Sequence, residues 1–129
     1  MKDIAITENH LYNKAFKNGD KYIGGLVTIH VLPDYTAKKR MLSHPKRLYT
    51  NRIGLSVTKK LGGAVERNRA KRIIRAGLRS VRDEEQLKTG KLIVISARNS
   101  ILNKTSEDVR KDLLRGFKKL DMFESKKNV

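Results

Sequence analysis

The chain has 129 residues and a mass of 14.8 kDa, enough for one compact domain with a single core and too little for two. Thirty Lys and Arg residues against thirteen Asp and Glu residues leave a formal net charge of +17, which predicts a polyanionic partner. Because it has no Cys and no apolar run near the roughly 20 residues of a membrane helix, the sequence excludes disulfide scaffolds and thiolate sites and predicts a cytoplasmic protein.

The N-terminal third predicts a helix followed by a strand. Apolar and aromatic side chains, including Tyr12 and Phe16, share one side of a short helix at residues 9–18. Gly19 is placed to end this helix in a left-handed conformation. A strand follows at residues 26–32, because its side chains alternate between two faces. The fully apolar face consists of Val27, Ile29 and Val31, and the other face carries Leu26, Thr28, His30 and Leu32.

The middle of the chain begins with a polar, basic loop at about residues 33–51. A second alternating strand is predicted at residues 52–58, and a helix follows at residues 64–82 with Glu66 near its positive end. The apolar, β-branched run at residues 91–97 predicts a strand that is covered on both faces.

The last predicted element is a helix that begins near Thr105. Asp108 lies three residues later, so the two residues form a capping box, and residues 124–129 form a frayed tail. The order α-β-β-α-β-α predicts one α+β domain over residues 1–129, a two-layer sandwich of a small mixed sheet and three helices. If the second and third strands are parallel, the general rule predicts a right-handed crossover between them.

The charge is concentrated in the middle of the chain. Residues 38–82 carry fifteen basic residues against one acid, Glu66, and so hold +14 of the formal charge. The predicted helix separates a basic side from an apolar side, where Gly77 would let it approach the sheet closely. Solvated helix faces usually mix Glu with Lys, whereas this basic side has no acid after Glu66. We therefore favour binding of nucleic acid over a purely solvated face.

The aromatic residues near the N-terminus admit two interpretations. Tyr12 and Phe16, with His30 on the first strand, either belong to the core and to a half-exposed strand, or line a groove that contacts unpaired bases with Thr28. The acids cluster at a helix end and a helix start, and the three His residues show no metal-ligand spacing. We therefore expect no catalytic residue and no metal site in the protein.

The segment at residues 52–78, RIGLSVTKKLGGAVERNRAKRIIRAGL, closely resembles the protein subunit of bacterial ribonuclease P. That family's pattern, SKK-x-G-x-AV-x-RNR-x-KR-x-x-R, is matched by Lys59, Lys60, Gly62, Ala64, Val65, Arg67, Asn68, Arg69, Lys71, Arg72 and Arg75. Thr58 stands where Ser is usual and keeps the hydroxyl. The resemblance extends over nearly the whole chain, through the end of the first helix, the third strand with Arg98, and the closing helix.

The resemblance implies a small basic protein that binds one large catalytic RNA and helps it to remove the 5′ leader from precursor tRNA. The active site would then lie in the RNA, and the protein would need no obligate protein partner. Mg²⁺ is implied for the holoenzyme, bound mainly by the RNA. The family fold also implies a left-handed crossover, against the general rule.

The resemblance also assigns residues to two RNA surfaces. The surface for the RNA subunit would consist of Lys59, Lys60, Arg67, Asn68, Arg69, Lys71, Arg72 and Arg75. The leader would lie in a cleft between the first helix and the sheet, at Tyr12, Phe16, Thr28 and His30, with Lys71 and Arg75 at its edge. His30 stands where the family often has an aromatic residue. The loop could either extend RNA contact, through Lys38, Lys39, Arg40, Lys46, Arg47 and the following Arg52, or be mobile without RNA.

Two other functions remain open from the sequence. A ribosomal-type RNA-binding protein with no nuclease role would share this composition and a similar α+β sheet. A protein-only nuclease would cleave precursor tRNA by itself with Mg²⁺, which the scattered acids do not favour.

Overall fold

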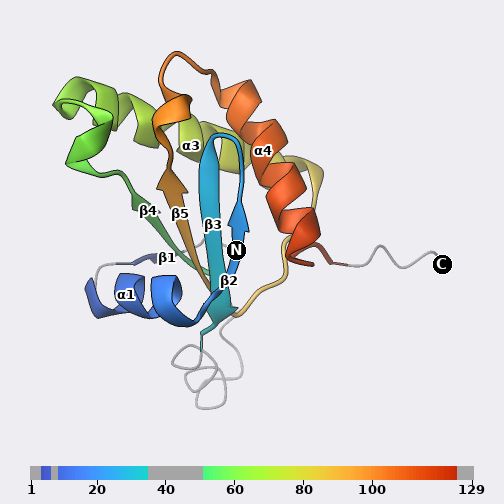
Figure 1. Cartoon of the computed structure of the whole chain (residues 1–129). Helices are drawn as coiled ribbons and strands as arrows, with labels where there is room; N and C mark the ends of the chain where they lie inside the picture. Colours follow the sequence, from blue (N-terminus) through green and yellow to red (C-terminus); the bar gives the residue numbers. More distant parts are fainter. Residues whose placement is uncertain (1–3, 7–8, 35–50, 125–129) are drawn as a thin grey trace.

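The computed structural model describes residues 4–6, 9–34 and 51–124 (Figure 1). The strands are β1 (Ile4–Ala5), β2 (Asp20–Ile23), β3 (Val27–Pro33), β4 (Arg52–Ser56) and β5 (Lys91–Ala97). The helices are α1 (Asn9–Asn18), α3 (Ala64–Glu84) and α4 (Ser106–Lys119), with short 3-10 helices at Lys59–Leu61 and Asn99–Ile101. The three predicted helices and three predicted strands are confirmed in their predicted order, and β1 and β2 are additional short strands.

The strands form one mixed sheet in the order β1-β4-β5-β3-β2. β1, β4 and β5 run parallel, whereas β3 is antiparallel to β5 and β2 is antiparallel to β3. As expected for a strand covered on both faces, the four residues from Leu92 to Ile95 in β5 are all buried. The fold therefore belongs to the α+β class predicted from the sequence.

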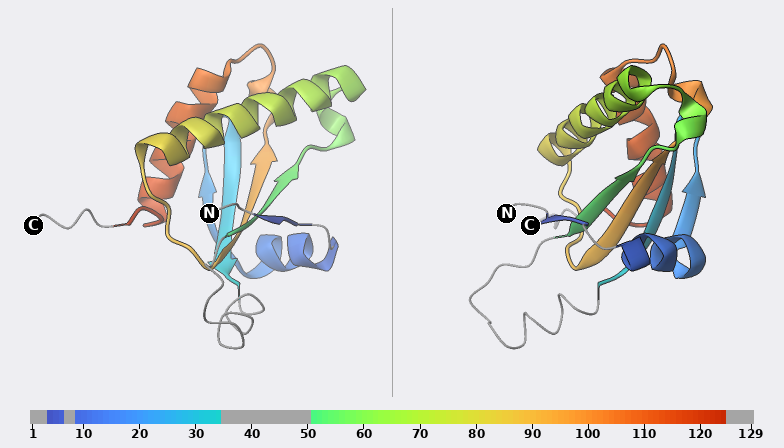
Figure 2. Two further views of the ribbon diagram at one scale, coloured as in Figure 1. Left: turned by 180° about the vertical axis from the view of Figure 1, so that it is seen from behind. Right: turned by 90° about the vertical axis from the view of Figure 1, so that its left-hand side faces the viewer.

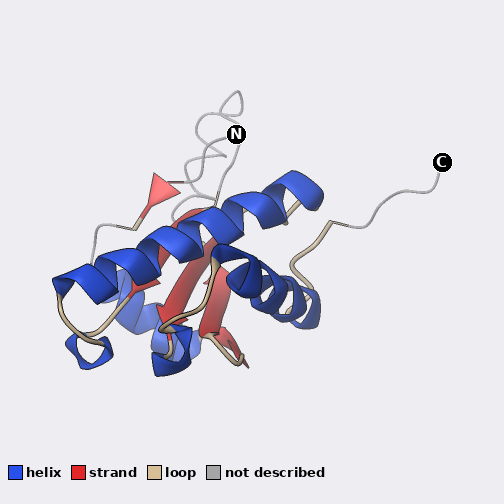
Figure 3. Ribbon diagram, turned by 90° about the horizontal axis from the view of Figure 1, so that it is seen from above, coloured by secondary structure: helices blue, strands red, loops and turns tan. Residues whose placement is uncertain are grey.

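The two faces of the sheet are covered differently. α3 and α4 lie against each other over one face, where they enclose the main core (Figures 2 and 3). The most deeply buried members of this core include Ile29, Ile74, Val81, Ile95, Val109 and Phe117. On the other face, α1 covers one end of the sheet by packing on Leu32, Leu92 and Val94. The sequence-predicted leader residues lie on the same face, with His30 beneath Phe16 of α1 and Thr28 farther from the helix.

The crossover from β4 through α3 to β5 is left-handed. In the left view of Figure 2, α3 lies in front of the sheet, the parallel strands point upward, and the chain passes from β4 on the right to β5 on the left. The general preference for right-handed crossovers is thus overridden, as the family resemblance implied.

Two glycines have roles other than those predicted. Gly19 does not have a positive φ, so it does not end α1 in a left-handed conformation. Close packing explains it instead, since a Cβ at this position would lie 2.6 Å from the carbonyl oxygen of Ala15. Gly77 brings α3 close to α4 rather than to the sheet, because a Cβ there would lie 3.0 Å from Val109 Cγ1 and 3.1 Å from the Ser106 carbonyl oxygen.

Buried polar contacts fix both ends of the basic loop. Arg52 donates two hydrogen bonds to Asp34, at 2.6 and 2.7 Å, and both side chains are largely buried. Asn51 donates to the Lys88 carbonyl oxygen and accepts from the Lys91 amide, both at 2.9 Å. Arg52, one of the cations considered for RNA contact, is thus paired with Asp34 within the fold, and its contact with RNA stays a prediction. Loop residues 35–50, with the other cations predicted there, lie outside the described residues.

The C-terminal end stays attached to the fold as far as Glu124, whose amide donates to the Gln86 carbonyl oxygen at 2.8 Å. The expectation that Glu124 belongs to a frayed tail is therefore wrong, and residues 125–129 lie outside the described part. Among the described helices, none is long and apolar enough to cross a membrane.

Candidate nucleic-acid interface

α1 is held on the sheet by Leu11 and Ala15, which leaves its aromatic side chains over particular sheet positions. The strand register places His30, Val94 and Gly54 side by side on β3, β5 and β4. The ring of Phe16 meets the His30 ring edge-on, with centroids 4.9 Å apart. Tyr12 covers Gly54 so closely that a Cβ there would lie 2.6 Å from the Tyr12 hydroxyl. The sequence alone does not show why position 54 is glycine.

The next row of paired residues across the sheet carries hydroxyl groups, which the sequence did not show to be neighbours. Thr28 lies beside Ser96, and Ser96 lies beside Ser56, on three adjacent strands and on the face that carries His30. All three residues are half-buried, and Ile23 extends the row at β2 with 61% of its surface exposed. Ser56 and Ser96 were missed because only the pairing register, and not the local pattern, places them beside Thr28.

His30 is more deeply buried than the half-exposed strand residue considered from the sequence, with 7% of its surface exposed. Its Nδ1 is buried without a hydrogen-bond partner among the described residues. Burial, together with the charge of Lys21 on β2, lowers the pKa of His30 below its ordinary value of 6.5. The imidazole is therefore neutral near pH 7 and presents its ring to Phe16, which remains 42% exposed.

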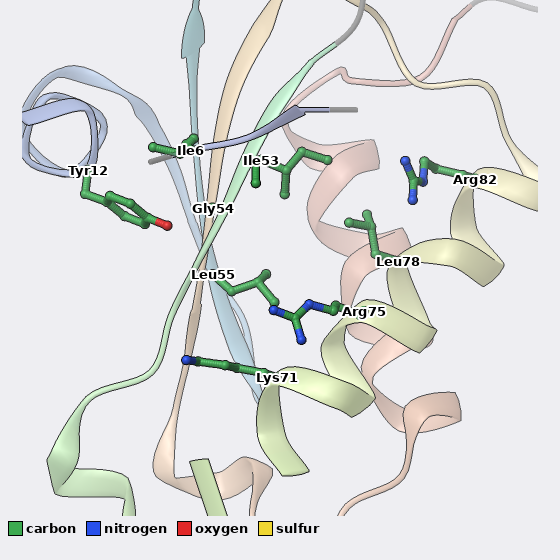
Figure 4. A pocket seen from close by; sticks show the side chains of 10 residues that line it. Ile6, Tyr12, Ile53, Gly54, Leu55, Lys71, Arg75, Leu78 and Arg82 are labelled. Atoms are coloured by element: carbon green, nitrogen blue, oxygen red, sulfur yellow. The ribbon is translucent and has the colours of Figure 1, made fainter. Parts of the chain in front are cut away.

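A pocket of about 360 Å³ opens at the edge of β4 (Figure 4). Its lining includes Tyr12 from α1, Ile53 and Leu55 from β4, and Lys71, Arg75 and Arg82 from α3. Three of the predicted leader residues, Tyr12, Lys71 and Arg75, therefore meet here. The other three, Phe16, Thr28 and His30, do not line the pocket and lie farther along the sheet face. Arg82 was not predicted, although it shares a helix flank with Lys71 and Arg75 in the 3.6-residue period.

α3 presents its cations on three sides, one toward the pocket, one toward solvent and one toward the start of α4. The flank that carries Lys71, Arg75 and Arg82 faces the pocket, whereas helix geometry turns Asn68, Arg72 and Arg79 away from the sheet into solvent. On the remaining flank, Arg69 donates to the Lys104 carbonyl oxygen at 2.6 Å. Arg67 makes a long bond, of 3.4 Å, to the Gly63 carbonyl oxygen. Lys59 and Lys60 are exposed on the 3-10 helix before α3.

Several acidic side chains near these surfaces are already engaged within the fold. Glu84 and Glu107 both accept hydrogen bonds from Arg110, which joins the end of α3 to the start of α4. Asp108 completes the predicted capping box with Thr105. In the described part of the chain, no three His, Asp or Glu residues are grouped so as to hold a metal ion.

Comparison with known proteins gives a consistent result. The sequence matches the family profile described as Ribonuclease P over residues 1–121. A ribonuclease P protein component from Bacillus cereus is 47% identical over 76 residues, which cover 59% of this chain and 64% of that protein. The chain thus aligns with just under two thirds of the length of this curated relative.

Solved structures share the fold. The RNase P protein of Staphylococcus aureus superposes with a TM-score of 0.72 and 24% identity, covering 95% of this chain and 100% of that one. The RNase P protein of Thermotoga maritima superposes with a TM-score of 0.63 and 20% identity, covering 89% of this chain and 94% of that one.

Proposed function

Because the chain belongs to the ribonuclease P family, we propose that it is the RNA-binding protein subunit of this tRNA-processing endonuclease. In this role it binds the catalytic RNA and the 5′ leader of precursor tRNA in the cytoplasm, and it assists removal of the leader. The family match over residues 1–121 and the two basic sides of α3, one toward the pocket and one toward solvent, support this proposal.

The observation that carries the proposal is the division of cations on α3. Arg72 and Arg79, with Asn68, face solvent and can meet the phosphates of a large folded RNA. Lys71 and Arg75 face the pocket beside Tyr12, where a single strand could pass from α3 onto the sheet face. One helix thereby serves two RNA molecules from two of its sides.

The surface for the catalytic RNA is proposed to consist of the outward and N-terminal cations of α3 and its preceding turn. Its members are Lys59, Lys60, Arg67, Asn68, Arg69 and Arg72, with Lys71 and Arg75 shared with the leader. Arg groups suit this task because their planar fork binds phosphate through two hydrogen bonds.

The leader tract is proposed to run from the pocket across the sheet face. It contains Tyr12, Phe16, Thr28 and His30, and the hydroxyls of Ser56 and Ser96 extend it. Phe16 offers an exposed ring for base stacking, while the hydroxyl row offers donors and acceptors to base edges. The buried His30 would support Phe16 rather than stack on a base itself.

Catalysis is proposed to reside in the RNA, with Mg²⁺ held mainly by RNA phosphates. In support, Glu84 and Glu107 are bound to Arg110, and Asp34 is bound to Arg52. These carboxylates already form ion pairs within the fold.

The proposal is tested by reconstituting the particle with a ribonuclease P RNA and measuring binding and cleavage of precursor and mature tRNA. We expect cleavage by the particle, no cleavage by the protein alone with Mg²⁺, and tighter binding of precursor than of mature tRNA. Cleavage by the protein alone would make it a protein-only nuclease. Equal affinity for the two tRNA forms would remove the leader assignment, and failure to bind the RNA would favour a ribosomal-type protein.

The variant Phe16→Ala separates leader binding from folding. Base–aromatic stacking contributes about 1–3 kcal/mol per base, so precursor affinity should fall at least about fivefold while mature tRNA affinity stays unchanged. A variant with normal precursor affinity and a large loss of thermal stability would instead place Phe16 in the core.

A further inference from the structure

The pocket at the edge of β4 combines two kinds of surface that phosphate binding alone does not require. One side is apolar and consists of Ile6, Ile53, Leu55 and Leu78. The other side carries Lys71, Arg75 and Arg82, and the side chains of Lys71 and Arg75 reach from α3 toward β4 (Figure 4). A ligand that fits both sides has an apolar, flat part and an anionic part.

The backbone of β4 adds hydrogen-bonding groups to this pocket. β1 pairs with β4 at Arg52 and Ile53, and the Ile6 amide donates to the Ile53 carbonyl oxygen at 3.1 Å. Along a strand, alternate residues direct their N–H and C=O groups to the same edge. Leu55 therefore directs its N–H and C=O groups toward the same edge as Ile53, where the pocket opens.

Size and shape favour a nucleotide over the alternatives. About 360 Å³ lies at the lower end of the range of about 300–1,000 Å³ typical of small-ligand pockets. A bare phosphate would leave the apolar wall unused. An acidic peptide that added a strand to β4 would need several residues of β4 with unpaired backbone N–H and C=O groups at this edge. Among the residues that line the pocket and lie past the pairing with β1, only Leu55 directs such groups to the edge.

We propose that this pocket receives one unstacked nucleotide of the 5′ leader, with its base against Leu55 and Leu78 and its phosphate on Arg75. Lys71 lies one turn before Arg75 on α3 and Arg82 about two turns after it, so these two cations would hold the neighbouring phosphates of the strand. The inference rests on the proposed function, because Tyr12 joins the pocket to the leader tract. It goes further by assigning a base-binding site at the edge of β4 and a role to Arg82. The N–H and C=O groups of Leu55 would meet the hydrogen-bonding edge of the base and so favour some bases over others.

The test uses the reconstituted particle and precursor tRNAs in which one leader nucleotide at a time lacks its base but keeps its phosphate. For the unaltered protein, one such substitution should weaken binding about fivefold or more, the lower end of the contribution of one bound base. The variant Ala5→Trp fills the pocket from an exposed position on β1. With this variant the intact leader should bind as weakly as the abasic one, and base removal at that position should have no further effect.

The matched control is Thr89→Trp, which adds the same bulk at an exposed position outside the pocket lining and should bind all leaders as the unaltered protein does. If Ala5→Trp changes nothing, or weakens intact and abasic leaders equally, the pocket holds no base and the inference is wrong. If an oligoglutamate peptide, and not the leader, loses affinity in Ala5→Trp, the occupant is a peptide. If the particle binds precursor and mature tRNA equally, the proposed function itself is wrong. If the particle prefers precursor tRNA but Ala5→Trp does not change its binding, only the assignment of the pocket is wrong.

A second pair of variants decides the matter if Ala5→Trp impairs folding. Arg82→Gln and Lys111→Gln each remove one exposed positive charge from a helix, but only Arg82 lines the pocket. We expect Arg82→Gln to weaken leader binding severalfold and Lys111→Gln to leave it unchanged. Equal losses in the two variants would show that Arg82 contributes only general charge.

Discussion

At the scale of single residues, Asp112 does more for the fold than its place in an amphipathic helix suggests. Its carboxylate accepts hydrogen bonds from the Tyr22 hydroxyl at 3.0 Å and from the amides of Leu26 and Val27 at 2.9 and 3.0 Å. These donors belong to the hairpin between β2 and β3, so α4 fixes that hairpin through one buried acid. Burial, together with the hydrogen bond to Asp112, raises the pKa of Tyr22.

Replacing this acid should therefore be costly. In Asp112→Ala the two amides and the Tyr22 hydroxyl lose their acceptor inside the protein, and we expect the free energy of unfolding to fall by about 3 kcal/mol. Urea unfolding followed by circular dichroism measures the change. The control Asp83→Ala removes an exposed acid from the end of α3 and should change stability by less than about 0.5 kcal/mol. Similar small effects in both variants would contradict the role given to Asp112.

His30 should make stability depend on pH. Its pKa is lower in the fold than in the unfolded chain, so its contribution is complete above about pH 6.5 and is lost as the pH falls through the folded-state pKa. Urea midpoints measured at about pH 7.5 and 5.5 should therefore drop more for the unaltered protein than for His30→Phe. The variant keeps a ring beside Phe16 and Lys21 but cannot be protonated. If the urea midpoints of the two proteins fall equally with pH, groups other than His30 cause the pH dependence of stability.

At the scale of elements, the contact between α3 and α4 depends on Gly77. Alanine has the higher helix propensity, by about 1 kcal/mol, but its Cβ would press on Val109 and on the α4 backbone. We expect Gly77→Ala to destabilise the protein by about 1–3 kcal/mol in urea unfolding. Arg79→Ala, on the solvent side of the same helix, should be neutral or slightly stabilising because it removes a repelling charge. Stabilisation by Gly77→Ala would mean that the two helices can separate without cost.

Most elements could be predicted because their signals are local. The period of α3, the apolar run of β5 and the capping box of α4 each occupy a single stretch of sequence. The two-residue β1 and the largely exposed β2 carry no such periodicity, so they were missed. The left-handed crossover was available only from the family resemblance, because local residues do not encode it.

The candidate site likewise has parts that could be predicted from the sequence and parts that could not. The cations of α3 follow from helical spacing, but their division between the pocket and the solvent depends on where the helix packs on the sheet. The row of Thr28, Ser96 and Ser56 depends on pairing between strands far apart in the chain, so no local pattern reveals it. The burial of His30 under Phe16 likewise depends on where Leu11 and Ala15 seat α1.

At the scale of the whole molecule, the formal charge of +17 is divided between surfaces of different character. The solvent side of α3 is strongly basic, whereas the sheet face beside α1 offers Phe16, hydroxyls and a neutral His30. A large folded RNA binds mainly through phosphates, and a single strand binds also through its bases. The two surfaces match these two modes.

This division predicts how salt affects assembly. Arg72→Ala should lower the slope of log affinity for the catalytic RNA against log salt by about one unit, as expected for the loss of one phosphate contact. Arg69→Ala should do the same and also lose its bond to the Lys104 carbonyl oxygen. The control Lys111→Ala removes an exposed cation from α4 and should leave the slope unchanged. An unchanged slope in Arg72→Ala would place the RNA subunit elsewhere.

The ion pair between Asp34 and Arg52, together with the bonds of Asn51, holds the chain on both sides of residues 35–50 independently of what connects them. The position is therefore suited to protein engineering. A fluorescent reporter or an affinity handle inserted between these fixed ends should leave the sheet register intact, since added loop length costs only about 0.6 kcal/mol for each doubling. Such a graft would place a probe at the end of the sheet where β3 ends and β4 begins, without altering either terminus.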